Sequence, residues 1–379
     1  MKKTSSLPFL GHQSIDYVIF FGAILVGVFG SVAVFSSSAV YSELRYQDAY
    51  LLFKKQLIFL VLGVGLMTFF AHLRTDLIRH LVYPMLVLGF LLLVFLFIPG
   101  LGTKVNAAQR WFRLGFLSIQ PAELAKVGLM LYLAHILAKK GDKVRELVHG
   151  VFPILSVVLC MMVLLILQPD FGSTVLVGLL ALLMLFLAGT RISYLLGLVA
   201  VTYPLLHYSI MGVDYRRKRL LSFLDPWADP QNSGFQMIQS FLGFHRGGLF
   251  GVGFGDGKQK LLYLPEAHTD FVFTSIGEEF GFLGALTVVL MFLVLIIRAW
   301  FGAKSQEDDF RRLAGFGLVL LLAFQTLFNL GVVIGLLPTK GLALPFISYG
   351  GSSLVCSYLL VGLLLNVTAV EHGGTKPRT

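Results

Sequence analysis

Residues 81–98 read LVYPMLVLGFLLLVFLFI, a run without a single charged side chain. About 20 apolar residues in a helix span the hydrocarbon core of a bilayer, so this run is typical of a transmembrane helix. Similar runs recur along the chain, which has 379 residues, 56% of them hydrophobic and 13% charged. A soluble domain carries about 25% charged residues and could not cover its surface with half that supply. The sequence therefore predicts an all-α polytopic membrane protein, organised as one membrane domain over residues 1–379.

The apolar runs divide into ten predicted spans. They cover residues 16–38, 56–73, 81–98, 121–138, 151–168, 173–188, 193–212, 270–297, 313–337 and 351–370. An even number of spans places both chain ends on the same side of the membrane. By far the longest break is the segment 213–269, which we expect to form a large loop between the seventh and eighth helices.

The distribution of lysine and arginine predicts which side holds the termini. With cytoplasmic termini, the inner segments carry 15 basic residues: Lys2, Lys3, Arg74, Arg79, Lys139, Lys140, Lys143, Arg145, Arg191, Arg298, Lys304, Arg311, Arg312, Lys376 and Arg378. The short outer loops then carry seven: Arg45, Lys54, Lys55, Lys104, Arg110, Arg113 and Lys340. Short cytoplasmic loops are the ones enriched in lysine and arginine. Both termini are therefore predicted to be cytoplasmic, and the long loop extracytoplasmic.

Composition also excludes several classes of protein. The net charge of +10 does not indicate nucleic-acid binding, because the basic residues form short clusters between apolar runs, where topology explains them. Cys160 and Cys356 both lie inside apolar runs, which excludes a disulfide scaffold and a cysteine-based metal site. The apolar run beginning near Tyr17 is too long for the core of a cleaved signal peptide, so we expect the first span to act as its own signal anchor.

The long loop is rich in charge. It contains seven basic residues, Arg216, Arg217, Lys218, Arg219, Arg246, Lys258 and Lys260, and five acidic ones, Asp214, Asp225, Asp229, Asp256 and Glu266. Long loops cross the membrane largely regardless of their charge, so this excess does not contradict the topology. Two interpretations stay open: an anionic ligand at the outer membrane face, or contact of Arg216–Arg219 with anionic lipid headgroups.

A glycine-rich run, Gly247–Lys258, reads GGLFGVGFGDGK and resembles a phosphate-binding loop at first sight. A P-loop requires glycine where Val252 stands and serine or threonine where Gln259 stands. The run is therefore interpreted as a tight turn whose glycines allow close backbone packing.

Ionisable residues within or beside membrane spans are costly and point to function. Glu123 and Lys126 begin the fourth span, Asp170 lies in the turn before the sixth, and Asp270 opens the eighth. Arg110 lies in the loop before the fourth span. Under the predicted topology all five lie at the outer interface. Convergence of several separate segments at one face is typical of an active site.

Each of these residues also has a purely structural interpretation. Glu123 and Lys126 are three residues apart and could form only an intrahelical ion pair. Asp170 could cap the sixth helix. Asp270 could be a first-turn carboxylate that interacts with a helix dipole.

Two further sites are interpreted as structural. Glu278 and Glu279 lie about two turns deeper than Asp270, and we expect them to be buried partners of basic residues rather than catalysts. His268 lacks companion ligands at the spacing of a zinc site.

Four groups of motifs closely resemble the SEDS family of bacterial cell-wall polymerases. They are QKLLYLPEAHTDF at 259–271, QPDFG at 168–172, Arg110-Trp111 followed by QPAELAK at 120–126, and LPTKG at 337–341 leading to LPFISYGGSS at 344–353. The resemblance covers nearly the whole chain in order. It departs from the usual motifs at Ala122, where serine is usual, and at Phe171, where leucine is common; neither change removes a reactive group.

The resemblance implies a peptidoglycan glycosyltransferase in a bacterial cytoplasmic membrane. Such enzymes join lipid II, the undecaprenyl diphosphate-linked disaccharide peptide, into glycan strands and release undecaprenyl diphosphate. Asp270 occupies the position of the family's essential aspartate, and Glu123, Lys126 and Asp170 match motif positions that line the same cavity. The supporting or substrate-binding residues implied in addition are Arg110, His268, Lys340 and Ser352.

The chemistry of glycosyl transfer agrees with this set of residues. A base must take the proton from the acceptor 4-hydroxyl as it attacks the anomeric carbon of the donor, and a carboxylate can do so. Burial would raise the pKa of Asp270 and a helix N-terminus would lower it, so the sequence leaves its value open. The departing diphosphate needs positive charge, from Arg110, Lys126, the basic loop or a divalent cation such as Mg²⁺ or Mn²⁺. Direct displacement implies inversion, and no other cofactor is expected.

The partners implied by the family are a class B penicillin-binding transpeptidase and membrane lipid. Two other classes of function stay open. The chain could move lipid-linked sugars across the membrane, although transporter sites lie near the midplane rather than at an edge. It could also be a scaffold for a partner, which would not need Asp270.

The family has division, elongation and sporulation branches. The loop segments LSFLDPWADP at 221–230 and GFQMIQS at 234–240 resemble the division branch more than the elongation branch. Divisome proteins are then expected as partners. The sporulation branch shares most of these motifs and stays an alternative.

Overall fold

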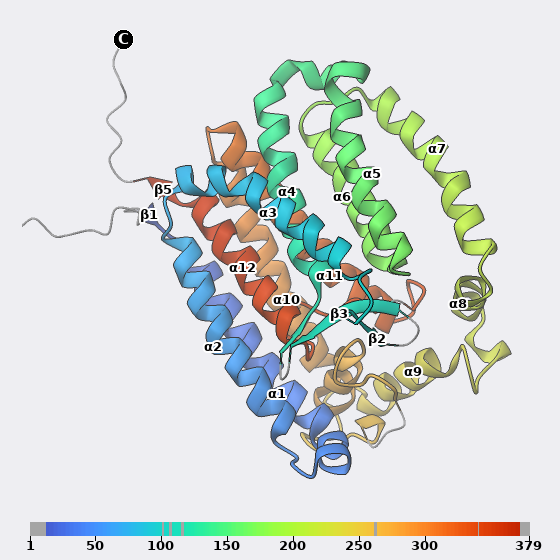
Figure 1. Ribbon diagram of the computed structural model, residues 1–379. Helices are drawn as coiled ribbons and strands as arrows, with labels where there is room; N and C mark the ends of the chain where they lie inside the picture. Colours follow the sequence, from blue (N-terminus) through green and yellow to red (C-terminus); the bar gives the residue numbers. More distant parts are fainter. Residues whose placement is uncertain are drawn as a thin grey trace, which may run out of the picture.

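The structure is a computed structural model that describes residues 13–100, 102–105, 108–114, 117–260, 264–339 and 341–371. Its architecture is a bundle of long helices, as Figure 1 shows. The helices are α1 (Tyr17–Tyr46), α2 (Leu51–Ala71), α3 (Thr75–Phe95), α4 (Pro121–Lys140), α5 (Phe152–Leu167), α6 (Phe171–Leu187), α7 (Ile192–Met211), α8 (Asp214–Leu224), α9 (Phe235–Gly247), α10 (Val272–Lys304), α11 (Asp309–Val333) and α12 (Gly351–Thr368).

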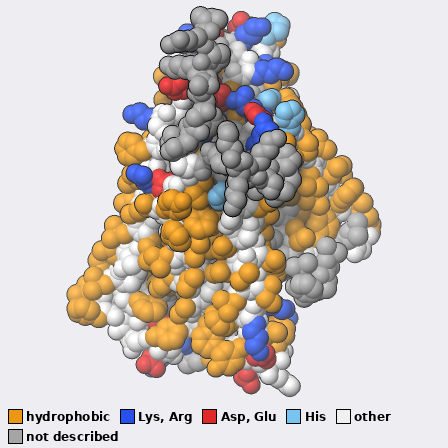
Figure 2. Space-filling model, turned by 90° about the vertical axis from the view of Figure 1, so that its left-hand side faces the viewer, with side chains coloured by type: hydrophobic (Ala, Val, Ile, Leu, Met, Phe, Trp, Pro, Cys, Tyr) orange, Lys and Arg blue, Asp and Glu red, His pale blue; other side chains and the backbone are white. Residues whose placement is uncertain are grey.

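The predicted fold class is confirmed. Each predicted span coincides with one helix, namely α1 to α7 and α10 to α12. Among the described residues, eight helices are long and apolar enough to cross a membrane, and the apolar helices Phe171–Leu187 and Ile192–Pro204 are shorter. On the face shown in Figure 2, hydrophobic side chains cover the middle and charged side chains gather towards the two ends. This pattern fits a protein that spans a bilayer.

Helix α1 is longer than the sequence predicts. The expected span ends at residue 38, but α1 continues to Tyr46. Serines stop the apolar pattern there, yet they are buried, and Ser37 Oγ donates to the Ala33 carbonyl 2.9 Å away within the helix. Ser36 Oγ instead donates to Glu279 of α10 over 2.6 Å, so contacts with another helix accompany the extension of α1 beyond its apolar part.

Two small sheets lie outside the all-helical expectation. Strands β2 (Gly102–Val105), β3 (Ala108–Leu114) and β4 (Leu117–Ile119) form an antiparallel sheet between α3 and α4. Strand β1 (Gln13–Ser14) pairs with β5 (Val370–Glu371). This pairing joins the two ends of the described chain at one end of the bundle, as an even number of spans requires (Figure 1).

We call the end that holds β1 and β5 the terminal end. The opposite loop end holds the described parts of the connections 47–50, 96–120, 168–170, 212–271 and 334–350. The predicted long loop lies there and contains helices α8 and α9. The most buried membrane helices are α4, α11 and α12. Since α4 and α12 begin at the loop end, and α11 ends there, the core helices connect directly to the segments that carry the predicted site.

Candidate active site

Asp270 lies in a tight turn that precedes α10 at the loop end. The turn is closed by backbone N–H groups of Thr269 and Phe271, which donate to the Glu266 carbonyl over 3.1 and 3.2 Å. Helix α10 has Phe271 as its N-cap residue and makes no side-chain capping bond. Half-buried Asp270 precedes this N-cap residue, and the first turn of α10 contains no acidic residue, so the interpretation of Asp270 as a first-turn carboxylate is not met.

The surroundings of Asp270 decide the question that the sequence left open. Burial and the carboxylate of Glu266 together raise the pKa of Asp270 to about 7, against the opposing effect of Arg219 and Arg110. Burial is the largest of these effects. A carboxylate with a pKa close to neutral pH is well matched to general base catalysis.

Arg110 and Asp170 meet at the same end of the bundle. Arg110 lies on β3 and donates through Nε to the Gln168 carbonyl over 3.4 Å and through Nη2 to the Pro169 carbonyl. Its Nη1 lies 3.9 Å from Asp170 Oδ1. Asp170 also caps α6 by accepting from the Ser173 backbone N–H over 3.3 Å. The capping interpretation of Asp170 is thus correct, and the same carboxylate neutralises part of the charge of Arg110.

Arg219 is a site residue that the sequence did not single out. It comes from α8, and its Nη1 donates to the Thr339 carbonyl over 3.0 Å. Together with Arg110 it places positive charge close enough to Asp270 to influence its pKa. In sequence, Arg219 is one of four consecutive basic residues, and only the fold distinguishes it from its neighbours.

Glu123 and Lys126 form a buried ion pair in the first turns of α4. Lys126 Nζ lies 2.8 Å from Glu123 Oε1, and the two residues are 0% and 7% exposed. Gln325 of α11 donates to Glu123 Oε2 over 2.8 Å, so the pair also ties two core helices together. The ion-pair interpretation is met by this geometry. A role of Lys126 towards a diphosphate stays a prediction.

Three further predicted residues complete the set. Ser352, at the start of α12, accepts from the Gln120 backbone N–H over 3.0 Å. The ring of His268 packs against those of Tyr41 and Tyr349, with centroids 4.9 and 5.8 Å away. Burial lowers the pKa of His268 and so disfavours the protonated ring, while Glu266 acts in the opposite direction. Lys340 lies outside the described residues.

The glycine-rich run and the two glutamates form a structural unit, as expected. A Cβ at Gly251 would lie 2.1 Å from the Glu279 carbonyl oxygen, so only glycine allows this approach. Glu279 is buried and pairs with Lys260 over 2.8 Å, while Ser36 of α1 donates to it over 2.6 Å. Glu278 accepts from the Lys258 backbone N–H over 2.9 Å. The run is thus fixed to α10, and Ser36 joins α10 to α1.

The donor set was also tested for a divalent cation. Within the described part of the chain, no three His, Cys, Asp or Glu side chains lie close enough to hold a metal ion. Mg²⁺ commonly uses one or two carboxylates together with substrate phosphates and water, so a site completed by the substrate is the form that fits these residues. A divalent cation stays a prediction.

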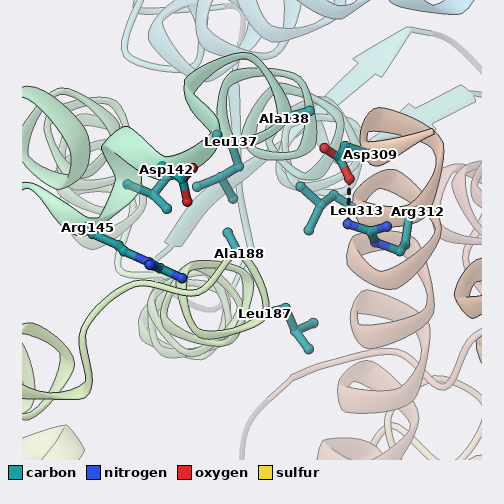
Figure 3. A pocket seen from close by; sticks show the side chains of 11 residues that line it. Leu137, Ala138, Asp142, Arg145, Leu187, Ala188, Asp309, Arg312 and Leu313 are labelled. Atoms are coloured by element: carbon teal, nitrogen blue, oxygen red, sulfur yellow. Dashed lines mark hydrogen bonds and ion pairs between the residues drawn. The ribbon is translucent and has the colours of Figure 1, made fainter. Parts of the chain in front are cut away.

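A cavity of about 250 Å³ lies at the terminal end and not at the predicted site. It is bounded by the last turn of α4, the end of α6 and the first turn of α11. Figure 3 shows Arg145 and Arg312 on opposite sides of it, with Arg312 paired to Asp309. None of the predicted site residues lines this cavity, so we do not assign it to the reaction.

The fold and the site define a multi-pass membrane protein with a raised-pKa carboxylate and two guanidinium groups at one end of its bundle. The chain belongs to the FtsW/RodA/SpoVE family, described as cell cycle proteins, whose model matches residues 16–372. The predicted membership of the SEDS family is therefore confirmed.

Similar proteins support this assignment. A probable peptidoglycan glycosyltransferase FtsW from Geobacter metallireducens is 45% identical over 358 residues, which cover 94% of this chain and 96% of that protein. Stage V sporulation protein E from Bacillus subtilis is 37% identical over 93% of this chain and 96% of its own. Among solved structures, a chain of a peptidoglycan synthase complex matches with a TM-score of 0.76 and 31% identity, over 94% of this chain and 98% of its own. Thermus thermophilus RodA matches with a TM-score of 0.69 and 28% identity, over 94% and 97%.

Proposed function

We propose that this chain is a peptidoglycan glycosyltransferase that polymerises lipid II at the outer face of the cytoplasmic membrane. The observation that carries the proposal is Asp270, a carboxylate with a pKa of about 7 in the electrostatic range of Arg110 and Arg219. Two relatives of the chain are named as probable peptidoglycan glycosyltransferases. An outer-face site follows from the predicted orientation with cytoplasmic termini, which rests on the positive-inside distribution.

The proposed reaction is a direct displacement. Asp270 takes the proton from the acceptor 4-hydroxyl while that oxygen forms a bond to the anomeric carbon of the donor. The bond from this carbon to the diphosphate oxygen breaks, and the electron pair leaves with undecaprenyl diphosphate. Arg110 and Arg219 stabilise the negative charge that develops on the leaving group. One displacement inverts the anomeric carbon and needs no covalent enzyme intermediate.

Purified lipid II tests this proposal against transport. The full-length protein, reconstituted in vesicles with its transpeptidase partner, should convert lipid II into glycan strands that are resolved by gel electrophoresis. The transport interpretation predicts instead that lipid II changes leaflet without forming strands. Strand formation by wild type and its absence in Asp270→Ala would establish the enzyme, whereas leaflet exchange without strands would replace it with a transporter.

We expect a single-span class B penicillin-binding transpeptidase as partner. A similar solved chain belongs to a complex that coordinates polymerisation with crosslinking. The described residues contain no soluble domain that could crosslink peptides, and the small sheets are too short for one. The expected result is co-purification of the two full-length proteins and a higher rate of polymerisation in the complex. A cognate transpeptidase that neither binds nor stimulates would contradict this prediction.

Within the family, we propose the division branch. Relatives called FtsW are 39–45% identical to this chain, and the sporulation protein is 37% identical. Both branches would catalyse one reaction, so the distinction lies in partner surfaces such as those for divisome proteins. Depletion in the source bacterium should give filaments without septa. Round cells that still divide would move the chain to the elongation branch and leave the enzymology unchanged.

Gly341 provides a test of the space around the Asp270 carboxylate. A Cβ at Gly341 would lie 3.0 Å from Asp270 Oδ2, so Gly341→Ala should displace the carboxylate by a few tenths of an ångström. We expect a fall in turnover of about 10-fold or more, because catalytic geometry is sensitive to displacements of this order. The control is Gly65→Ala in α2, where a Cβ would meet nothing within 4 Å. Equal polymerisation rates for the two variants would show that the carboxylate adapts without loss.

A further inference from the structure

The backbone of the Asp270 turn is tied to the rest of the site by a side chain of α11. Asn329 is 2% exposed, and its Nδ2 donates to two carbonyl oxygens. One is the carbonyl of Asp270, 2.9 Å away, and the other is that of Leu342, 2.7 Å away. A single buried amide therefore joins the turn before α10, the segment 341–349 and helix α11.

The orientation of this amide follows from its partners. Both neighbours of Nδ2 are carbonyl oxygens, and a flipped amide would place an oxygen against two oxygens. Asn329 Oδ1 is then a buried acceptor that has no hydrogen-bond partner among the described residues. An unpaired buried acceptor lowers the stability of the protein, so stability alone does not explain an asparagine at position 329.

A second side chain reinforces the same connection. Ser348 donates through Oγ to the Thr269 carbonyl over 2.6 Å and accepts from the Leu344 backbone N–H over 2.8 Å. The Tyr349 backbone N–H also donates to the His268 carbonyl over 2.9 Å. Three consecutive carbonyls, those of residues 268, 269 and 270, thus accept hydrogen bonds from outside the turn. A turn with its peptide planes fixed in this way points the Asp270 side chain in one direction.

We propose that Asn329 is a positioning residue for Asp270: its amide fixes the peptide after the aspartate relative to the segment 341–349 and so sets the direction of the carboxylate. This inference rests on the proposed function, because it concerns the same reaction. Asn329 acts through the backbone and is not assigned a contact with substrate.

The first experiment does not depend on activity. Hydrogen–deuterium exchange of the full-length protein in detergent is measured on peptides that cover 264–272 and 341–349. Asn329→Leu keeps the side-chain volume and removes the donor, and it should speed exchange in both peptides. Ser348→Ala removes the hydrogen bond to the Thr269 carbonyl and should speed exchange in the same two peptides to a smaller extent. This variant tests the proposal even if Asn329→Leu fails to fold.

The matched control is Asn366→Leu in α12. Asn366 is 0% exposed, and its Nδ2 likewise donates to backbone carbonyls, those of Phe70, Ala71 and Leu73, but at the terminal end. The variant Asn366→Leu should destabilise the protein without changing exchange in the peptides 264–272 and 341–349. Unchanged exchange in Asn329→Leu and Ser348→Ala, or an equal increase in Asn366→Leu, would overturn the proposal.

The second experiment measures polymerisation of lipid II per folded molecule. Misplacing a catalytic group by about 1 Å can cost about 100-fold, and we expect kcat of Asn329→Leu to fall on the order of 100-fold. KM should stay within about twofold, because Arg110 and Arg219 are untouched. A rise in KM with unchanged kcat would contradict a positioning role. If wild type forms no strands, the proposed function fails, and the exchange experiment still decides whether Asn329 positions the turn.

Discussion

Asp270→Asn should abolish the polymerisation of lipid II while the protein folds and binds its partner normally. The amide has almost the same shape as the carboxylate but cannot take a proton, and loss of a general base typically costs about 10²–10⁴-fold in rate. Measured strand formation should therefore fall to background. Asp256→Asn is a suitable control, since Asp256 is an exposed carboxylate in the segment between α9 and α10. Retained activity in Asp270→Asn would refute the base assignment.

The pH dependence of wild type follows from the same residue. A base must be unprotonated to act, and burial raises the pKa of Asp270 to about 7. The polymerisation rate should therefore increase about 10-fold per pH unit below about pH 7 and level off above it. A rate that is independent of pH between 5 and 8 would indicate that Asp270 is not the titrating base.

Stability should respond to pH in the opposite direction. A carboxyl group whose pKa is raised on folding keeps a proton that the unfolded chain has released, from about pH 4 to pH 7. The contribution of Asp270 to stability therefore falls as pH rises through this interval. Asp270→Asn lacks this effect, so at pH 8 its thermal unfolding in detergent should occur at a higher temperature than that of wild type. A lower unfolding temperature would mean that Arg110 and Arg219 stabilise the carboxylate more than burial disfavours it.

Glu123→Gln should destabilise the protein strongly. The change leaves the ammonium group of Lys126, which is 0% exposed, without its counter-charge. Removing one partner of a buried ion pair typically costs about 3–5 kcal/mol. The double variant Glu123→Gln/Lys126→Met removes both charges and should recover most of this loss. Thermal unfolding of the two variants measures the difference.

A matched control exists on the protein surface. Lys54 Nζ and Asp48 Oδ2 are 2.9 Å apart, close to the 2.8 Å of the buried pair, but their side chains are 62% and 36% exposed. Lys54→Met should cost less than about 1 kcal/mol, as is usual for exposed pairs. If Glu123→Gln is no more destabilising than this control, the buried pair contributes little to stability.

Activity of the double variant separates the two roles of the pair. A stable double variant with normal polymerisation would make the pair structural and remove Lys126 from the residues proposed to face the diphosphate. A stable but slow double variant would support the catalytic roles that the family motifs imply. The same comparison applies to Asp170, whose carboxylate both caps α6 and approaches Arg110.

The membrane spans could be predicted from the sequence because a transmembrane helix satisfies its backbone hydrogen bonds within itself. Local composition then suffices, and the run at 81–98 indicates α3 without reference to any other segment. Where polar residues interrupt the pattern, the prediction was wrong, as at the end of α1. The small sheet between α3 and α4 was missed for a related reason, since its strands depend on pairing and not on a long apolar run.

The position of Asp270 and the identity of the family also came from the sequence, because linear motifs carry both. The tertiary structure alone decided the properties of that aspartate. Its pKa depends on burial and on charges of Glu266, Arg219 and Arg110, and its backbone is held by Asn329, which follows it by 59 residues. These effects act through distances of a few ångströms between segments far apart in the chain. Because a sequence does not contain such distances, it pointed to Asp270 but not to the raised pKa on which the proposed role as a base depends.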